Sequence, residues 1–533
     1  MDNSTIYKSI TKSKDGYDIP VLKNNKSLHS IYSPIKEAST FGNIKPTKNL
    51  FTIILGLGGG YHIQSFAEKN PEHFIMIIEN STKDISFLSS IECVKNLKQK
   101  RNILISNIEN LYQNILKNYS PVIHNGINIL SNRQWIEFDH QKTNLILETI
   151  NTAIETIGKD FSVQAHFGFI WQKNIISNLK ILSTLNFQKI EIPNNKTAAI
   201  IAAGPSLDYT ISKIKKDRNK YFIISTDTGL QVIKKHNLNC DAVISIDGQN
   251  ISYKHFIGLK NFSNTIFIFD LQSNFNAVNF ATRISNKIIF TCSNHPFSIY
   301  ANINGSNKNQ NEEFINNENT FLNLSNGAGT VTIAAIDFAK KCGFNQIEVF
   351  GADFSYPFNK PYAKGTYLDS IYRYPETKIS PAENDYINLL FRTEISKSFL
   401  KNKYKNTTKI QTELLTSYEQ TFLQWIRENN YTYNYEDFIY NLKGDNKFSN
   451  TKSIKINFNY EKFIHTLKND LKKINDKLNF DKNKQPFNNV SINDLSNIEI
   501  TLLPYISYLK NKYKNIDYNE CLKLAMTKIL QYT

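Results

Sequence analysis

From Thr197 onward the sequence contains a series of short, continuously apolar runs, and amphipathic helical segments separate most of them. Strands that are apolar on both faces and alternate with helices are typical of a mostly parallel, doubly wound sheet. We therefore predict a central α/β domain of the Rossmann-like type. Its predicted strands are AAIIAAG (198–204), YFIIST (221–226), AVISID (242–247), TIFIFD (265–270), KIIFTC (287–292) and QIEVFG (346–351).

A first α/β unit precedes this domain. Residues 50–79 predict a strand, a glycine-rich turn (GLGGGYH), an amphipathic helix and a second strand that ends at Glu79. Residues 102–106 predict a further strand, and the apolar positions of 142–182 recur at helical spacing. Before about residue 45 the pattern is weak and polar. A G-x-G-x-G turn followed by an acidic strand end is typical of a nucleotide or S-adenosylmethionine pocket.

After about residue 380 no strand pattern recurs, and the Lys- and Asn-rich remainder is predicted to be helical, with an apolar stripe along Tyr460–Leu478. Residues 303–320 form a polar insertion that we expect to be a loop or a partly disordered flap. The expected domains are an N-terminal Rossmann-like accessory domain (1–140), a helical connector (141–194), a central domain that carries the chemistry (195–384) and a helical C-terminal domain (385–533).

Composition limits the class of protein. Apolar residues make up 41% of the 533 residues, which is enough for sizeable cores. The five cysteines are scattered without a C-x-x-C pair, which argues against a disulfide framework or structural zinc and favours a reducing compartment. No signal peptide is visible, and no apolar run approaches the ~18 residues of a membrane span. We therefore expect a cytoplasmic protein.

The formal net charge of +16 has two interpretations. The chain is rich in Lys, Asn and Ile throughout, as expected of AT-rich coding DNA, and this accounts for most of the excess. The alternative is an anionic partner. The basic residues form no recognisable nucleic-acid motif, so we expect no nucleic acid. An anionic small substrate or an acidic protein surface fits equally well.

Open parallel sheets bind ligands at the carboxyl ends of their strands, so the residues that follow the predicted strands are the candidate site. Gly204 permits a tight turn and Ser206 can cap the next helix, whose N–H groups then face an anion. Asp227 and Asp247 end adjacent strands and could bind Mg²⁺, a sugar hydroxyl or a cytosine amino group. His295 is a candidate general base. Helix capping and plain solvation are the structural alternatives for all of these residues.

A longer motif, SNGAGTVTIAAIDFAKKCGFNQIEVFGADFSY (325–356), places small residues at the start of a helix at the same edge of the sheet. Bare helix N–H groups beside a small-residue loop suit a phosphate or a flat base. Together with IIAAGPSLD, STDTGL and ISIDGQ, this motif resembles the motility associated factor (Maf) glycosyltransferases. These enzymes attach nonulosonic acids (sialic, pseudaminic or legionaminic acid) to Ser or Thr of flagellin. The stretches are also similar to bacterial sialyltransferases and to the archaeal 6-hydroxymethylpterin pyrophosphokinase.

The resemblance implies a CMP-activated nonulosonic acid as donor, flagellin as partner and a sugar-nucleotide pocket in the central domain. By motif, Asp227 and Asp247 stand where the sialyltransferases carry donor-contacting asparagines. Because two carboxylates would repel an anionic donor, a divalent metal becomes more plausible, and the metal question stays open. For the N-terminal domain the resemblance implies an accessory role without an established cofactor. The pocket residues carried over are Gly204 and Ser206 for the nucleotide, Ser325, Asn326 and Gly327 for the cytidine, and Tyr356 and Tyr362 for the departing phosphate.

The general base stays unassigned, because no histidine occurs between Gly351 and Ile464 where the sialyltransferases carry theirs. Asp247 and His295 are the candidates. Two other functions remain open. One is a diphosphokinase that transfers pyrophosphate from Mg-ATP to a pterin alcohol, which the two strand-end aspartates would suit. The other is a non-catalytic protein that binds flagellin and has lost the base.

Overall fold

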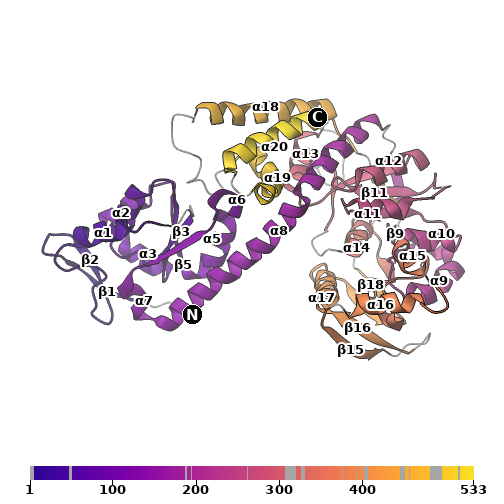
Figure 1. The fold of residues 1–533 in the computed structure, drawn as a ribbon, viewed down its shortest axis with the longest axis horizontal. Coiled ribbons are helices and arrows are strands. Elements are labelled where there is room, and N and C mark those ends of the chain that lie inside the picture. The colour runs from indigo at the N-terminus through magenta and orange to yellow at the C-terminus, as the bar shows by residue number, and fades with distance from the viewer. Residues whose placement is uncertain are drawn as a thin grey trace. The chain divides into compact units, whose positions relative to one another are not determined.

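The computed structural model divides the chain into two compact units (Figure 1). Unit 1 comprises Met1–Phe169 and Leu467–Leu530, and unit 2 comprises Ile170–Thr466 and Gln531–Thr533. Among the described residues, no helix is long and apolar enough to cross a membrane. The structure describes residues 5–46, 51–185, 189–193, 195–260, 262–306, 320–325, 330–374, 376–391, 393–400, 406–444, 451–454, 456–480, 492, 495–513 and 516–533.

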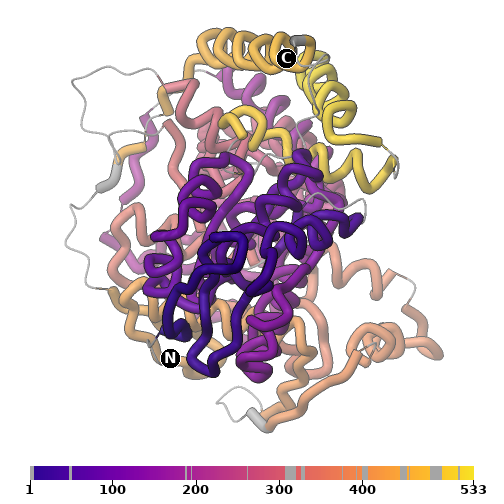
Figure 2. The backbone as a smooth tube through the Cα atoms, turned by 90° about the vertical axis from the view of Figure 1, so that its left-hand side faces the viewer, coloured from indigo at the N-terminus to yellow at the C-terminus, as the bar shows by residue number. Residues whose placement is uncertain are grey.

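Unit 1 is built on a four-stranded parallel sheet with the order β5-β4-β3-β6. Every residue of β3 and β4 is buried, which explains why both were visible in the sequence as apolar runs. The first 45 residues are more ordered than predicted, because they form an antiparallel hairpin, β1 (Tyr7–Lys12) with β2 (Asp18–Leu22), followed by α1 (Pro34–Gly42); Figure 2 shows this segment in indigo. The sheet strands are β3 (Phe51–Leu55), β4 (Phe74–Glu79), β5 (Ile103–Asn107) and β6 (Ile127–Ser131).

Helices surround the sheet of unit 1, and the chain returns to this unit at its end. The helix α8 (His140–Thr184) is 45 residues long and runs from unit 1 into unit 2. Within unit 1 it crosses α19 closely: a Cβ atom at Gly168 would lie 1.8 Å from the Pro504 carbonyl oxygen. The other helices of unit 1 include α2 (Tyr61–Lys69), α3 (Thr82–Leu88), α4 (Glu92–Leu97), α5 (Leu111–Asn118), α6 (Pro121–His124), α7 (Arg133–Phe138), α19 (Asn497–Lys512) and α20 (Tyr518–Tyr532).

Unit 2 contains a nine-stranded sheet with the order β13-β12-β11-β10-β9-β8-β14-β18-β17. The first seven strands in this order are parallel, as predicted, and their buried residues form the core. Six of them correspond to the six predicted strands, with ends that differ by a few residues at most. They are β8 (Thr197–Ile201), β9 (Tyr221–Thr226), β10 (Ala242–Ser245), β11 (Ile266–Asp270), β12 (Ile288–Cys292) and β14 (Gln346–Phe350); β13 is Leu322–Asn323.

The strand order creates a topological switch point between β8 and β14. From β8 to β13 each strand is added on the same side of its predecessor, whereas β14 returns to the other side of β8. The helix α14 (Val331–Lys341) makes this return and packs against β8, β9 and β10. Because parallel βαβ crossovers are right-handed, reversal of direction moves the connecting helix to the opposite face of the sheet. The loops that follow β8 and β14 therefore diverge, which is where such sheets bind ligands.

The segment after residue 384 differs from the predicted helical domain. It contains the strands β17 (Thr432–Glu436) and β18 (Ile439–Lys443), and β18 extends the central sheet by pairing antiparallel with β14. Their sequences, TYNYE and IYNLK, carry the aromatic and β-branched residues that favour strands, but polar neighbours obscured the pattern. The remaining elements of this segment are β15 (Ile395–Leu400), β16 (Thr407–Thr412), α17 (Glu413–Glu428), β19 (Thr451–Ile454) and α18 (Tyr460–Phe480).

Candidate functional site

A cavity of about 280 Å³ lies at the switch point of unit 2. Its wall includes the loops that follow β8 and β14 and the start of α14, with further residues from the end of β9 and from α17. An open parallel sheet with a cavity at this position is the usual arrangement of a ligand site. The described lining residues are Ala202, Ala203, Gly204, Thr226, Thr228, Thr330, Val331, Thr332, Gly351, Ala352, Asp353, Phe354, Ser355, Tyr356, Pro361, Tyr362, Leu415 and Tyr418.

Two glycines allow the loops after β8 and β14 to approach each other. The Gly204 amide donates a hydrogen bond of 2.8 Å to the Gly351 carbonyl. A Cβ atom at Gly204 would lie 2.3 Å from Asp353 Oδ2 and 2.5 Å from the Gly351 oxygen, so no other residue fits without a shift. Gly351 has a φ of +68°, and a Cβ there would lie 2.8 Å from the Ala202 oxygen. The predicted role of Gly204 as a tight turn against the site is therefore consistent with its geometry.

Asp353, which lies within the long motif of residues 325–356, is a buried carboxyl group on the cavity wall. Its Oδ2 accepts a hydrogen bond of 2.9 Å from the Ser206 amide. Within the described part of the chain, Oδ1 has no hydrogen-bond partner. Burial raises the pKa of Asp353 to about 6, against an ordinary value of 3.8. A carboxyl group with such a pKa can exchange a proton near neutral pH.

Ser206 is fully buried, and it is not among the described residues of the cavity wall. It occupies the N-cap position of α9 (Leu207–Lys216), but its side chain makes no capping hydrogen bond. The start of α14 does reach the cavity through Thr330, whose hydroxyl accepts from the Thr332 amide. The 11-residue helix α14 begins here, so the positive end of its dipole is directed at the cavity.

Several lining residues were not predicted as site residues. Thr226 and Thr228 flank a predicted aspartate at the end of β9, and Leu415 and Tyr418 come from α17. Nothing local in the sequence distinguishes the α17 pair, because their position depends on how a segment some 200 residues after Gly204 packs. The predicted tyrosines, Tyr356 and Tyr362, both line the cavity. Asn326 and Gly327 lie outside the described residues, and the neighbouring Ser325 donates its amide to Asp337.

Asp227 and Asp247 do not line the cavity. Asp227 is 2% exposed, and its carboxylate accepts hydrogen bonds from the Ser245 hydroxyl and from Thr228. Asp247 lies after β10, where its Oδ1 accepts from the Gln249 amide. Both carboxylates thus cap the loops that follow their strands. In the described ranges no three His, Cys, Asp or Glu side chains are grouped as metal ligands.

His295 is also engaged in local structure. It is the N-cap residue of α13 (Pro296–Asn304), where Nδ1 accepts a hydrogen bond of 3.2 Å from the Phe297 amide. Its ring packs edge-on against Trp171. Burial lowers the pKa of His295 to about 3. The histidine is therefore neutral at physiological pH, and it is not among the described residues of the cavity wall.

The second half of α8 explains why part of the sheet edge is closed. The Asn174 amide donates to the carbonyls of Gly248 and Gln272, and the Asn178 amide donates to those of Leu271 and Ser273. These two asparagines are four residues apart and therefore lie on one face of the helix. They fix the loops after β10 and β11 under α8, which leaves the ends of β8, β9 and β14 to form the cavity.

Comparison with known proteins places this fold in a family. Residues 173–359 match the family model described as 6-hydroxymethylpterin diphosphokinase MptE-like. An uncharacterized protein of Treponema pallidum (strain Nichols) is 36% identical over 146 residues, which are 27% of this chain and 70% of that protein. A second is 42% identical over 108 residues, 20% of this chain and 34% of that protein. The structure of the MAf glycosyltransferase from Magnetospirillum magneticum AMB-1 superposes with a TM-score of 0.53 at 10% identity, covering 100% of this chain and 93% of that one.

The central part of this chain carries the MptE-like domain, and the whole chain has the fold of a Maf glycosyltransferase. The predicted α/β fold class is confirmed, and the predicted resemblance to the Maf glycosyltransferases is confirmed at the level of the fold. The matched residues begin within α8 and end after β14, so they include the switch point and most of the cavity wall, but not Pro361, Tyr362, Leu415 and Tyr418.

The space above the glycine-rich turn of unit 1 is filled by side chains of the same unit. Glu79, fully buried, accepts hydrogen bonds from the amides of Leu57 and Asn80, the Tyr7 hydroxyl and the Trp135 indole. Burial raises the pKa of this carboxyl group. Cβ atoms at the glycines would collide with neighbouring side chains: that of Gly56 with Trp135, and that of Gly58 with His29, at 2.7 Å each. The space that a dinucleotide phosphate would need above this turn is therefore occupied.

Proposed function

We propose that this chain is a glycosyltransferase that moves a nonulosonic acid from a CMP-sugar to Ser or Thr of flagellin, in the cytoplasm before export. The observation that carries the proposal is the cavity at the β8–β14 switch point of a chain with the fold of a Maf glycosyltransferase. A sialic-, pseudaminic- or legionaminic-type sugar is the donor class that the sequence motifs imply. The surplus of positive charge favours an acidic sugar nucleotide.

In this proposal the donor lies between the loops after β8 and β14. Gly204 lets the nucleotide approach the backbone closely, because no Cβ intervenes. The start of α14 at Thr330 faces the phosphate, and the hydroxyls of Tyr356 and Tyr362 donate to it as it departs. The segment with Ser325, Asn326 and Gly327 would hold the cytidine, and Ser206 would position the turn.

The reaction is a displacement at the anomeric carbon of the sugar. The acceptor hydroxyl oxygen forms the new bond, the bond between the anomeric carbon and the phosphate oxygen breaks, and CMP leaves with the electron pair. A base must take the hydroxyl proton. We assign this role to Asp353, because it lines the cavity, its Oδ1 has no partner within the described residues and its pKa of about 6 leaves it ionised at neutral pH. Asp247 and His295, the candidates from the sequence, have local hydrogen-bond partners elsewhere.

A second candidate function is the Mg-ATP-dependent pterin diphosphokinase, which the description of the matching family model favours. It would use the same cavity with a different nucleotide. A divalent metal would be required for this reaction and is optional for the first. The third candidate is a flagellin-binding protein without catalysis, which the lack of a histidine on the described cavity wall favours.

Nucleotide binding distinguishes these functions. We expect CMP to raise the apparent melting temperature of the full-length chain, because ligands that bind the folded state stabilise it by mass action. Tyr362→Phe should weaken this effect, whereas Tyr374→Phe, a change at a tyrosine that is 95% exposed, should not. Stabilisation by ATP with Mg²⁺ and not by CMP would replace the first proposal with the kinase. An unchanged melting temperature with every nucleotide would favour the non-catalytic protein.

Transfer itself is tested with purified flagellin and CMP-activated nonulosonic acids, with and without Mg²⁺ or Mn²⁺. Intact-mass analysis should show addition of one or more sugar masses to flagellin. Asp353→Asn should abolish the addition while CMP still binds. An unchanged flagellin mass under all metal conditions, despite CMP binding, would contradict the proposed acceptor and leave only the nucleotide assignment.

A further inference from the structure

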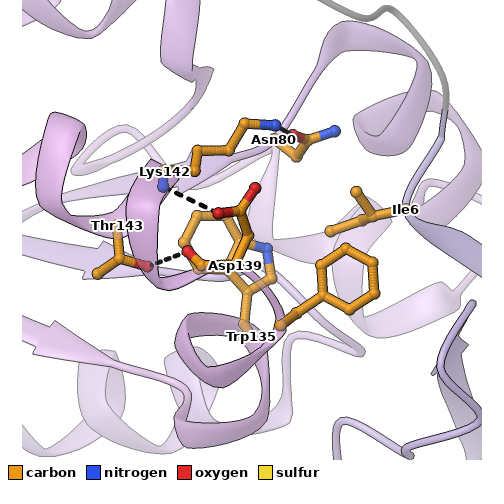
Figure 3. A pocket seen from close by; sticks show the side chains of 7 residues that line it. Ile6, Asn80, Trp135, Asp139, Lys142 and Thr143 are labelled. Atoms are coloured by element: carbon orange, nitrogen blue, oxygen red, sulfur yellow. Dashed lines mark hydrogen bonds between the residues drawn. The ribbon is translucent and has the colours of Figure 1, made fainter.

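Unit 1 contains a second cavity, of about 210 Å³, beside the carboxyl end of β4 (Figure 3). Asn80, which follows the last residue of β4, lies on its wall together with the start of α8. This is the edge of the parallel sheet where ligands of open α/β domains bind. Because the neighbouring glycine turn is filled by Tyr7, His29 and Trp135, the cavity is the open part of this edge.

Hydrogen bonds fix the orientation of the Asn80 side chain, which forms part of the polar wall of the cavity. Asn80 is 8% exposed, and its Nδ2 donates a hydrogen bond of 2.6 Å to Asp84 Oδ2. Asp84 is fully buried and also accepts from the Ile6 amide and the Ser81 hydroxyl. With Nδ2 committed to Asp84, the Oδ1 of Asn80 faces the Lys142 ammonium, which donates to it (Figure 3).

Among the residues that the structure describes, Lys142 has no carboxylate partner. Its side chain is half-buried, and within the described part of the chain its ammonium pairs only with the neutral oxygen of Asn80. Asp139 also lines the cavity, but it is exposed to solvent and its Oδ1 accepts from the Lys142 backbone amide. A partly desolvated ammonium without a counter-ion is costly, and an anion bound beside it would offset the cost.

The rest of the wall is apolar. Ile6, Trp135 and Phe138 line the cavity, and the indole N–H of Trp135 is already donated to Glu79. The surface of Trp135 that remains is therefore hydrophobic. The Thr143 hydroxyl donates to the carbonyls of Ile136 and Asp139, so it offers no donor to a ligand. One ammonium beside an apolar wall suits a singly charged anion, since a phosphate would require several donors.

We propose that this cavity binds a small monocarboxylate with a flat apolar body, whose carboxylate pairs with Lys142 Nζ while its body contacts Ile6, Trp135 and Phe138. The inference is independent of the proposed glycosyl transfer, because it concerns a different sheet and none of the residues of the first cavity. The charge pairing determines which ligands are accepted: the ammonium selects the carboxylate form over a neutral amide of the same shape.

The test uses the full-length protein and two matched probe pairs, benzoate with benzamide and indole-3-acetate with indole-3-acetamide. Binding is measured by titration calorimetry up to about 10 mM, which is tenfold above a Kd of about 1 mM. We expect at least one carboxylate to bind, and its amide to bind at least about tenfold more weakly. Failure of both carboxylates to bind, or equal binding of carboxylate and amide, would overturn the proposal.

Two variants locate the binding site. Lys142→Met, which keeps the length of the side chain and removes its charge, should weaken carboxylate binding at least about tenfold. Lys159→Met on the exposed side of the same helix is the matched control and should leave binding unchanged. Circular dichroism confirms that both variants fold. Equal carboxylate binding by the wild type and Lys142→Met would overturn the assignment. If a variant does not fold, the comparison of carboxylate with amide binding by the wild-type protein still tests the proposal.

Discussion

A methyl group at Gly204 would meet two oxygens at once, one from Asp353 and one from the Gly351 carbonyl. Neither oxygen can move away easily, because both belong to residues that follow the buried strand β14. We therefore expect Gly204→Ala to lower the free energy of unfolding by about 2 kcal/mol or more and to remove CMP binding. Gly158→Ala is the control, since a Cβ there has nothing within 4 Å and alanine favours the helix by about 1 kcal/mol. Urea unfolding of both variants checks the difference, and equal effects would contradict the close approach.

The Asp353 carboxyl group should make stability depend on pH. Its folded-state pKa of about 6 lies above the ordinary value of 3.8, so its stabilising contribution is complete below about pH 4 and is lost as the pH rises through 6. Asn mimics the protonated acid. The stability of Asp353→Asn relative to the wild type should therefore rise between pH 4 and pH 7, by at most about 3 kcal/mol.

Asp270→Asn is the comparison for this prediction. Burial raises the pKa of Asp270 to about 7, so the rise should start at the same pH, continue to higher pH and reach at most about 4 kcal/mol. Because Asp270 does not line the described cavity, CMP binding should survive its substitution. Denaturant unfolding at a series of pH values measures both effects. A constant difference between Asp353→Asn and the wild type would show that Asp353 is not buried as described.

At the scale of elements, α8 closes one side of the sheet edge through Asn174 and Asn178. Asn178→Ala would leave the carbonyls of Leu271 and Ser273 without their donor in a buried setting, which should cost about 2–3 kcal/mol. Asn151→Ala, at an exposed position of the same helix, should change stability by less than about 0.5 kcal/mol. Thermal unfolding monitored by circular dichroism compares the two. Equal melting temperatures would indicate that water replaces the Asn178 amide.

The parallel strands were predictable because they are buried on both faces, so each reads as an apolar run. The strands β17 and β18 were missed because polar neighbours interrupt their apolar residues, and because β18 pairs with β14, far away in sequence, and β17 pairs with β18. The site shows the same limit. Gly204, Tyr356 and Tyr362 follow from motifs, whereas Leu415 and Tyr418 depend on the packing of α17. Both Asp353 and Asp227 follow strands, so their position in the sequence could not show which of them lines the cavity. The Asp227 carboxylate instead accepts hydrogen bonds from Ser245 and Thr228.

At the scale of the whole molecule, the first cavity lies entirely within unit 2, including its wall from α17. A chain shortened to residues 1–480 keeps this wall, whereas one shortened to 1–400 loses α17, β17 and β18. We expect CMP to stabilise the first and not the second. Loss of α19 and α20 should destabilise unit 1 in both. Differential scanning calorimetry with and without CMP checks this, and CMP binding by the shorter chain would contradict the described cavity wall.

Unit 1 joins the two ends of the chain, with α19 packing on α6 and crossing α8. When the protein is made, the first 169 residues leave the ribosome long before Leu467–Leu530 exist. At about 5–20 residues per second, the interval is roughly 15 to 60 s. Throughout that time the surfaces of α6 and α8 that α19 will cover stay exposed, while Ile170–Thr466 emerges with all of its own sheet. The unit that begins first is therefore completed last.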